Sequence, residues 1–353
     1  MINYFKIDRP IRYMIKFVIL FILLIQVLTG CSSSNSSKDK NAAPYITKTA
    51  LQLNTVVTIN LYDKQDQKIL DGCFDLIAKY ENIYSTTINT TELYKLNHGT
   101  LPHNGLTYHI SNELAGVLQY GLYYCKLSGG SFDISIGPAS SLWDFIDPNP
   151  KVPPKQEIEA ALPYIDYKNI TLDGNDLTFT KEGIQIDLGA IAKGYIADRI
   201  KDYLLANGVK SAMINLGGNV LCVGGKPDGS PFRVGIQKPF ADRNETVAII
   251  EITDLSVVSS GIYERFFKQD GVLYHHILDP KTGFPVNNNL VAVTIISKVS
   301  ADGDGLSTSC FALGLDKGMA LIETIPDTYA AFITKDYQIH YTKGFQDAIK
   351  FAQ

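Results

Sequence analysis

The feature that most constrains the fold is a succession of short strand patterns in the second half of the chain. They lie at residues 211–216, 219–223, 232–237, 247–252, 256–260 and 290–297, and a hairpin is expected to turn at Asp270-Gly271. Longer helical patterns lie elsewhere, at residues 69–84, 111–127, 189–207, 304–314 and 316–325. Successive strands with helices clustered in other parts of the chain are typical of mainly antiparallel sheets. The sequence therefore predicts an α+β fold.

One further strand is expected near the start of the folded part. Residues Leu51 to Leu61 alternate in hydrophobicity, with Leu53, Thr55, Val57 and Ile59 on one face. Three of these side chains are β-branched, and alternation of this kind has the period of a strand. The pattern therefore predicts a single strand over this stretch.

The folded part shows no internal division. From Pro44 to the C-terminus the chain has no linker, repeat or long charge run. A chain of roughly 300 residues suits one large domain or two closely joined lobes. We therefore expect a single two-lobed domain over residues 47–353.

The first thirty residues have the parts of an export signal. Four basic residues precede the apolar run Phe17–Leu28. This run of about a dozen residues is shorter than the roughly 20 that a membrane-spanning helix needs. It is followed by Leu28-Thr29-Gly30-Cys31, which resembles the bacterial lipobox, in which the cysteine is acylated and becomes the new N-terminus. An uncleaved signal anchor is the alternative.

A polar, Ser-rich stretch begins directly after Cys31. Such a stretch cannot pack and behaves as a flexible tether. We therefore expect a signal peptide over residues 1–30, a lipid on Cys31 and a tether over residues 31–46. This arrangement predicts an extracytoplasmic lipoprotein that is held at the cell membrane.

The charge balance argues against nucleic acid as a partner. The whole chain has a net charge of -4, and removal of residues 1–30, with their four basic residues and Asp8, brings it to about -7. Binding to nucleic acid requires basic clusters, which this acidic chain lacks. The cysteines beyond the signal form no C-x-x-C pair, so we expect buried thiols instead of a zinc site or a disulfide framework. They are Cys73, Cys125, Cys222 and Cys310.

Two segments with glycines at predicted element ends are candidates for binding an anion. Ser128–Pro138 follows a helix, and its glycines allow backbone amides to approach a ligand. Ile186–Gly194 runs from a strand into the start of a helix, where free amides favour an anion. Lys193 would add a positive charge beside a phosphate. A capped helix with a solvated lysine is the alternative.

A strand that feeds a tight turn contains His275 and His276. Histidine is a natural general base near neutral pH. Strand alternation places one imidazole on each face, so only one of the two is expected to take part in chemistry. A purely structural pair is the alternative.

Hard oxygen ligands are expected near residues 301–309. Asp304 and Thr308 are four residues apart and lie on one face of a helix. A carboxylate and a hydroxyl placed in this way would suit Mg²⁺. An Asp-capped helix with a back-bonded threonine is the alternative.

Taken together, these segments resemble the ApbE family of FAD:protein FMN transferases. The motifs that carry the resemblance occur in the family's order, at residues 131–133 (SFD), 187–194 (DLGAIAKG), 276–283 (HILDPKTG) and 304–308 (DGLST). The resemblance extends from about residue 50 to 345. It implies an enzyme that uses Mg²⁺ to transfer FMN from FAD to a threonine or serine hydroxyl, with release of AMP. The acceptor would be a membrane-bound or exported protein with a flavinylation motif.

The resemblance also implies roles for individual residues. Asp304, Thr308 and the backbone carbonyl of Ala190 match the magnesium ligands. His276 matches the base that deprotonates the acceptor hydroxyl. The residues that match FAD contacts are Leu53, Ser131, Phe132, Asp133, Asp187, Lys193 and the backbone near Ile277.

Two positions depart from the family pattern. Leu53-Asn54-Thr55 stands where the family has Met-Gly-Thr, and it keeps an apolar side chain for the ligand. Ser85-Thr86-Thr87 stands where the family has Ser-Thr-Tyr, so the aromatic ring that would stack on the ligand is absent at Thr87, with Tyr84 as a neighbouring substitute. Weaker exclusion of water would permit hydrolysis of FAD to FMN and AMP. An FAD pyrophosphatase and a non-catalytic flavin-binding lipoprotein are therefore the alternative functions.

Overall fold

The structure is a computed structural model that describes residues 45–242 and 244–352. Beyond the N-terminal segment the chain forms one compact unit. The predicted signal peptide, the lipid site at Cys31 and the tether as far as Pro44 lie outside the described residues. The first strand begins at Ile46, the last residue of the predicted tether. No helix within the described ranges is long and apolar enough to cross a membrane.

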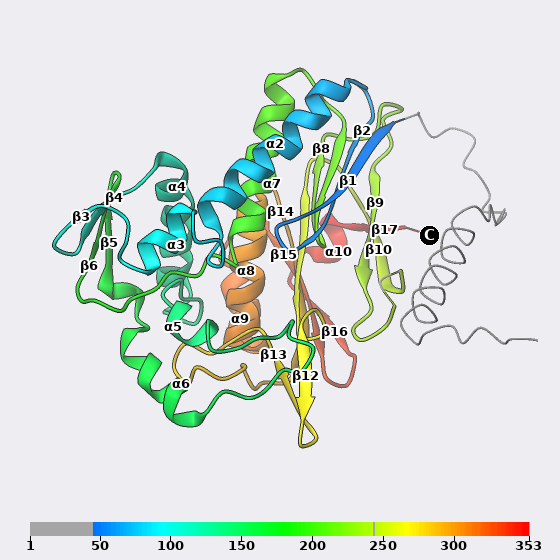
Figure 1. Ribbon diagram of the computed structural model, residues 1–353. Coiled ribbons are helices and arrows are strands. Elements are labelled where there is room, and N and C mark those ends of the chain that lie inside the picture. Colours follow the sequence, from blue (N-terminus) through cyan, green and yellow to red (C-terminus); the bar gives the residue numbers. More distant parts are fainter. Residues whose placement is uncertain (1–44, 243, 353) are drawn as a thin grey trace, which may run out of the picture. The chain divides into compact units, whose positions relative to one another are not determined.

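An eight-stranded sheet with antiparallel neighbours lies at the centre of this unit (Figure 1). In spatial order its strands are β1 (Ile46–Gln52), β2 (Thr55–Leu61), β7 (Ala212–Leu216), β8 (Asn219–Val223), β11 (Ser256–Gly261), β14 (Leu290–Ser297), β15 (Tyr329–Thr334) and β16 (Ile339–Tyr341). A three-stranded sheet contains β17 (Lys350–Phe351), β10 (Thr246–Ile252) and β9 (Phe232–Gln237), also antiparallel.

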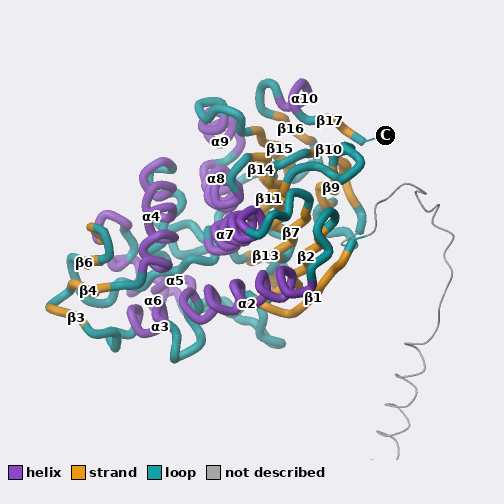
Figure 2. The backbone as a smooth tube through the Cα atoms, turned by 90° about the horizontal axis from the view of Figure 1, so that it is seen from above, coloured by secondary structure: helices purple, strands orange, loops and turns teal. Residues whose placement is uncertain are grey.

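Helices cover one face of the large sheet, on the opposite side from β9 and β10 (Figure 2). Those that pack on the strands are α2 (Gln67–Tyr84), α7 (Ala192–Ala206) and α8 (Ser300–Leu313). Outside them, α4 (Asn112–Leu127) packs against α8, and α9 (Leu315–Ile322) packs against both α8 and strand β15. Ser111 caps α4 as expected, because its side chain accepts a hydrogen bond from Leu114 N. Antiparallel sheets with clustered helices confirm the predicted α+β fold.

The large sheet is therefore buried on both faces. One core lies between the sheet and the helices and includes Ile77, Leu118 and Ile196. A second core lies between the large sheet and the three-stranded sheet and includes Phe232 and Ile296. All eight residues of β14 are buried, which explains why this strand is almost continuously apolar in sequence.

A four-stranded sheet was not predicted from the sequence. Its strands are only two to four residues long, too short to show a period: β3 (His103–Asn104), β4 (Thr107–His109), β6 (Asp176–Phe179) and β5 (Ile170–Asp173). The remaining elements are α3 (Glu92–Asn97), α5 (Gly137–Ser140), α6 (Lys155–Ala161), β12 (Phe266–Gln269), β13 (Val272–His275), α10 (Phe345–Ala348) and short 3-10 turns at Leu162–Tyr164 and Tyr167–Asn169. The β12–β13 hairpin turns at Asp270-Gly271, as predicted.

The prediction of one strand over residues 51–61 was wrong. The chain reverses at Leu53-Asn54, so that β1 and β2 form a hairpin with Gln52 opposite Thr55. Both turn residues have positive φ (54° each), as a two-residue hairpin turn with the twist of the strands requires. Asn tolerates this conformation well, but Leu rarely adopts it. The Leu53 N–H donates to Glu81 Oε1 at 2.8 Å, which ties the turn to α2.

Candidate active site

A close backbone contact between α7 and α8 brings Lys193 and Asp304 together. A Cβ atom on Gly194 would lie 2.3 Å from the Ser300 carbonyl oxygen, so glycine is required for this approach. Gly194 N donates to Asp304 Oδ2 at 2.6 Å, and Lys193 Nζ lies 3.9 Å from Asp304 Oδ1. The start of α7 therefore combines helix amides and a lysine ammonium with a carboxylate that is only 4% exposed.

Two residues that sequence reasoning missed hold α8 in place. Asn219 Nδ2 donates to Asp304 Oδ1 at 3.2 Å. Asp198 accepts hydrogen bonds from the backbone N–H groups of Ser300 and Ala301 at 2.8 and 2.9 Å, and burial raises the pKa of Asp198 to about 6. These contacts join segments that are far apart in sequence, so no local signal predicts them.

Thr308 lies one turn beyond Asp304 and faces the end of β11. Its Oγ1 lies 3.2 Å from Ser260 Oγ, which is also 2.8 Å from Ser307 Oγ. The alternative in which Asp304 caps its helix does not hold, because α8 begins at Ser300 with Val299 at the N-cap position. Asp304 and Thr308 are therefore interior helix residues on a shared face.

The donor set around Asp304 can be compared with what a metal needs. Within residues 45–242 and 244–352, no group of three or more His, Cys, Asp and Glu side chains could hold a metal ion. The donors on and beside α8 are the Asp304 carboxylate and the hydroxyls of Thr308 and Ser260. The Ala190 carbonyl, in the turn before α7, stays a predicted ligand. Mg²⁺ binds through one or two carboxylates and takes other ligands from water and substrate phosphates. This oxygen donor set fits Mg²⁺ and does not fit a structural zinc site.

The two adjacent histidines have different environments. His275 is 5% exposed; Ile277 N donates to its Nδ1 at 3.3 Å, and its Nε2 lies 3.0 Å from the Val286 carbonyl oxygen. Since a carbonyl can only accept, His275 is a neutral imidazole with its proton on Nε2. Burial lowers the pKa of His275 to about 4. This histidine serves the structure.

His276 presents a free nitrogen. Its Nδ1 lies 3.2 Å from the Arg265 carbonyl oxygen, so Nδ1 carries the proton and Nε2 keeps its lone pair. In the described part of the chain, no hydrogen-bond partner occupies Nε2. Burial, followed by the nearby Arg265 charge, lowers the pKa of His276, and the Lys193 charge acts in the same direction. His276 is therefore neutral at pH 7 and lies within electrostatic range of Lys193.

Asp133 is engaged by the chain itself. Its Oδ1 accepts hydrogen bonds from the Ser135 N–H and hydroxyl at 2.8 and 2.7 Å, and its Oδ2 accepts one from Tyr167 N at 2.9 Å. Burial raises the pKa of Asp133. Phe132 is buried, and Ser131 beside it is partly exposed. The carboxylate shapes this loop, and the FAD contacts implied for these three residues stay predictions.

The two glycine-containing segments lie side by side. Asp187 N donates to the Ile134 carbonyl at 2.8 Å, and Ile136 pairs with Gln185 in a parallel bridge. Asp187 Oδ1 accepts from Gly189 N and its Oδ2 accepts from the Ser140 hydroxyl, both at 2.7 Å. The chain thus joins the loop after α4 to the turn before α7.

Tyr84 does not replace the aromatic ring that is missing at Thr87. It is 6% exposed, packs on the rings of Tyr80 and Tyr195, and donates from its hydroxyl to the Glu113 carbonyl at 2.8 Å. Thr87 itself is exposed and hydrogen-bonded to Ser85. The substitute considered from the sequence is therefore fixed in the core.

The remaining predicted contacts are more dispersed. Leu53 lies at the β1–β2 turn, and the Ile277 carbonyl accepts from Val286 N at 2.9 Å. Among the described residues, no hydrogen bond or ion pair joins Leu53 or Ser131 to the Lys193–Asp304 contact. Neither of two cavities among the described residues, of about 330 and 270 Å³, is lined by a residue that the sequence assigned to the site.

The start of α7 carries a lysine beside a buried carboxylate, and a neutral histidine lies within electrostatic range of that lysine. On a helix-covered antiparallel sheet, this arrangement suits an enzyme with a phosphate-containing substrate. The profile of the ApbE family matches residues 53–333, and the chain belongs to this family. It is similar to an FAD:protein FMN transferase of Klebsiella pneumoniae (36% identical, covering 82% of this chain and 89% of that protein). It is also similar to one of Treponema pallidum (32% identical, covering 85% and 87%).

Among solved structures, the ApbE protein of Thermotoga maritima superimposes with a TM-score of 0.78 at 28% identity, covering 86% of this chain and 98% of that one. The expected family, its fold and the transferase class are thereby confirmed. The roles of individual site residues stay predictions.

Proposed function

We propose that the chain is an FAD:protein FMN transferase that acts on a protein outside the cytoplasm. Its relatives of that name and its family membership support the reaction. The observation that carries the assignment to this site is the state of His276, whose Nδ1–H is held on the Arg265 carbonyl while Nε2 stays available. A fixed neutral imidazole of this kind is suited to accept a proton.

In the proposed reaction, the hydroxyl oxygen of an acceptor threonine or serine attacks the phosphorus on the FMN side of the FAD pyrophosphate. A bond forms between that oxygen and phosphorus, and the bond from this phosphorus to the bridging oxygen breaks. His276 Nε2 takes the hydroxyl proton, and AMP leaves with the bridging oxygen. Lys193 would bind the negatively charged phosphates.

Magnesium belongs to the proposal as the cofactor. Asp304, Thr308 and the Ala190 carbonyl would hold it, and the N–H of Gly194 and the amide of Asn219 orient the Asp304 carboxylate. When bound, Mg²⁺ supplies neutralisation of the charge that develops on the phosphate oxygens. Lys193 contributes positive charge to the same carboxylate and phosphates.

The cell location is also proposed. A lipid on Cys31 and a tether of roughly 15 residues, with a reach on the order of 20 Å by random-coil scaling, would keep the enzyme near membrane-bound acceptors. Globomycin inhibition of the lipoprotein signal peptidase tests this part. If the chain is processed at Cys31, the drug should cause the unprocessed chain to accumulate. An unchanged amount of mature chain would contradict the lipid anchor at Cys31.

FAD hydrolysis is the second candidate, and one observation favours it. The position of the family's aromatic residue is held by the exposed Thr87, and Tyr84 is fixed in the core. Water would therefore compete with the acceptor hydroxyl for the same phosphorus. Incubation with FAD and Mg²⁺ alone, followed by chromatography of FMN and AMP, measures this competition.

The matched variant is Thr87→Tyr. If the missing ring admits water, this variant should release less free FMN than the wild type in the absence of acceptor. Equal release by the two proteins would show that position 87 does not control water access. No release of AMP with or without an acceptor, despite flavin binding, would favour the non-catalytic flavin-binding alternative.

A further inference from the structure

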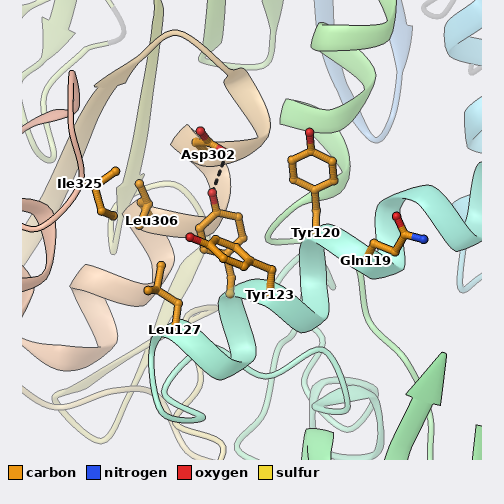
Figure 3. A pocket seen from close by; sticks show the side chains of 8 residues that line it. Gln119, Tyr120, Tyr123, Leu127, Asp302, Leu306 and Ile325 are labelled. Atoms are coloured by element: carbon orange, nitrogen blue, oxygen red, sulfur yellow. Dashed lines mark hydrogen bonds between the residues drawn. The ribbon is translucent and has the colours of Figure 1, made fainter. Parts of the chain in front are cut away.

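A cavity of about 330 Å³ lies apart from the candidate active site, between α4, α8 and the segment after α9 (Figure 3). Its size is at the lower end of the range for small-ligand sites, about 300–1,000 Å³. We call it the Asp302 pocket. Its lining consists of Gln119, Tyr120, Tyr123, Tyr124, Leu127, Asp302, Leu306 and Ile325. Asp302 is the one charged side chain in this lining.

The Asp302 carboxylate is partly exposed and has one hydrogen-bond partner among the described residues. Its Oδ1 accepts a hydrogen bond from the Tyr124 hydroxyl at 2.6 Å, seen as the dashed line in Figure 3. By contrast, three carboxylates that are buried accept hydrogen bonds at both oxygens; these are Asp133, Asp198 and Asp304. Across the described residues, no hydrogen bond reaches Asp302 Oδ2, and no Lys, Arg or His forms an ion pair with Asp302.

The Asp302 pocket is separate from the predicted magnesium site because it lies on the other side of α8. Two residues of helix correspond to a rotation of about 200°, so Asp302 and Asp304 point in nearly opposite directions. Asp304 faces α7, where Gly194 N donates to it, and Asp302 faces α4, where Tyr124 donates to it. A ligand of the Asp302 pocket would therefore not be a ligand of the metal site.

The chemistry of the walls selects one kind of ligand. The rings of Tyr123 and Tyr124 meet edge to face, with centroids 5.0 Å apart, and Tyr123 is 56% exposed at the rim. Tyrosine faces attract cations, and a half-buried carboxylate without a counter-ion does so more strongly. Leu127, Leu306 and Ile325 add an apolar wall that suits a short hydrocarbon stem.

We propose that the Asp302 pocket binds a primary alkylammonium group, with the ammonium on Asp302 and among the tyrosine rings and the alkyl stem on the leucine side. Two sources carry this group: a free alkylamine and the lysine side chain of a protein partner. The site does not depend on the transfer chemistry, and its test needs neither FAD nor Mg²⁺.

The test is isothermal titration of the full chain with n-butylammonium chloride, with n-butanol as the neutral control. The wild type should bind the ammonium saturably and the alcohol at least tenfold more weakly. Asp302→Asn keeps an acceptor for Tyr124 and removes the charge, and it should weaken ammonium binding by roughly tenfold or more. Asp316→Asn, at an exposed position on α9, is the matched control and should bind as the wild type does.

A second variant guards against misfolding as an explanation. Tyr123→Leu keeps apolar bulk at an exposed position and removes the aromatic face, so it should bind several-fold more weakly while its thermal unfolding stays near that of the wild type. The peptide acetyl-Gly-Lys-Gly-amide separates the sources, because binding of both ligands supports a lysine side chain and binding of the amine alone supports a free ligand. Absence of saturable ammonium binding, or equal binding by wild type and Asp302→Asn, overturns the proposal.

Discussion

Acidification should destabilise this protein through His275, and the effect can be calculated from the structure. The imidazole is 5% exposed, with Nδ1 accepting from Ile277 N and Nε2–H donating to the Val286 carbonyl. A second proton would have to bind at Nδ1, which would break the hydrogen bond from Ile277 N. Burial beside the Phe311 ring also disfavours the charged imidazolium. Burial, together with the positive charge of Lys335, lowers the pKa of His275 to about 4.

The sign follows from proton linkage. The unfolded chain has an ordinary histidine pKa of about 6.5, so below that pH the unfolded state binds the proton and the folded state does not. The stability that the neutral His275 contributes is fully present above about pH 6.5 and is lost as the pH falls toward 4. With these two pKa values, the linkage relation gives a loss of roughly 2 to 3 kcal/mol in the free energy of unfolding between pH 7.5 and pH 4.5.

The assay compares urea unfolding of the wild type and His275→Gln at pH 7.5, 6.0 and 4.5, followed by circular dichroism. Glutamine does not titrate and keeps one donor and one acceptor. The difference in unfolding free energy between the two proteins should shift by roughly 2 to 3 kcal/mol in favour of the variant as the pH falls. His103→Gln, at an exposed position, is the control for the chemical change alone. A difference that stays constant over this pH range would refute the assignment of His275 as a buried neutral group.

Three further predictions follow from the site. Gly194→Ala should lower the free energy of unfolding by about 1–3 kcal/mol in urea titrations, because its Cβ would lie 2.3 Å from the Ser300 carbonyl oxygen; unchanged stability would show that α7 and α8 can separate freely. Asp304→Asn should raise the Mg²⁺ concentration needed for half-maximal AMP release by roughly tenfold or more, whereas Asp302→Asn, two residues away on the opposite face, should match the wild type. The acidic limb of kcat/KM for FMN transfer should lie below pH 6, because the lowered pKa of His276 keeps it neutral there; a limb at pH 6.5 or above would contradict this environment.

Candidate site residues were easiest to select from the sequence where polar side chains lie near the predicted ends of helices or strands. Lys193 and Asp304 belong to motifs at or near helix starts, and the structure places them 3.9 Å apart. The local pattern could not provide the partners that orient them, Asn219 and Asp198, because tertiary packing alone brings these segments together. Asp133 shows another limit of the local pattern, which did not indicate that both carboxylate oxygens accept hydrogen bonds from the chain's own donors. Its contact with FAD stays a prediction.

The fold was predictable at the level of class and less so at its turns. Alternation runs without interruption through Leu53-Asn54, so a period of two predicts one strand where the chain forms a hairpin. The turn depends on a leucine with a φ of 54°, which residue preferences argue against. The four-stranded sheet was not predicted for another reason. Its strands of two to four residues are too short to show an alternating pattern, and pairing with neighbouring strands stabilises them.

The central claim is that His276 serves FMN transfer to a protein. It is tested most directly by the covalent flavin on membrane proteins of cells that express the wild-type chain or His276→Ala. Proteins separated on a denaturing gel should show flavin fluorescence only with the wild type, and mass spectrometry of the fluorescent band should find one FMN on a threonine or serine. Equal covalent fluorescence with both chains would contradict the role of His276. Free FMN and AMP without any covalent flavin would contradict transfer and leave hydrolysis as the activity.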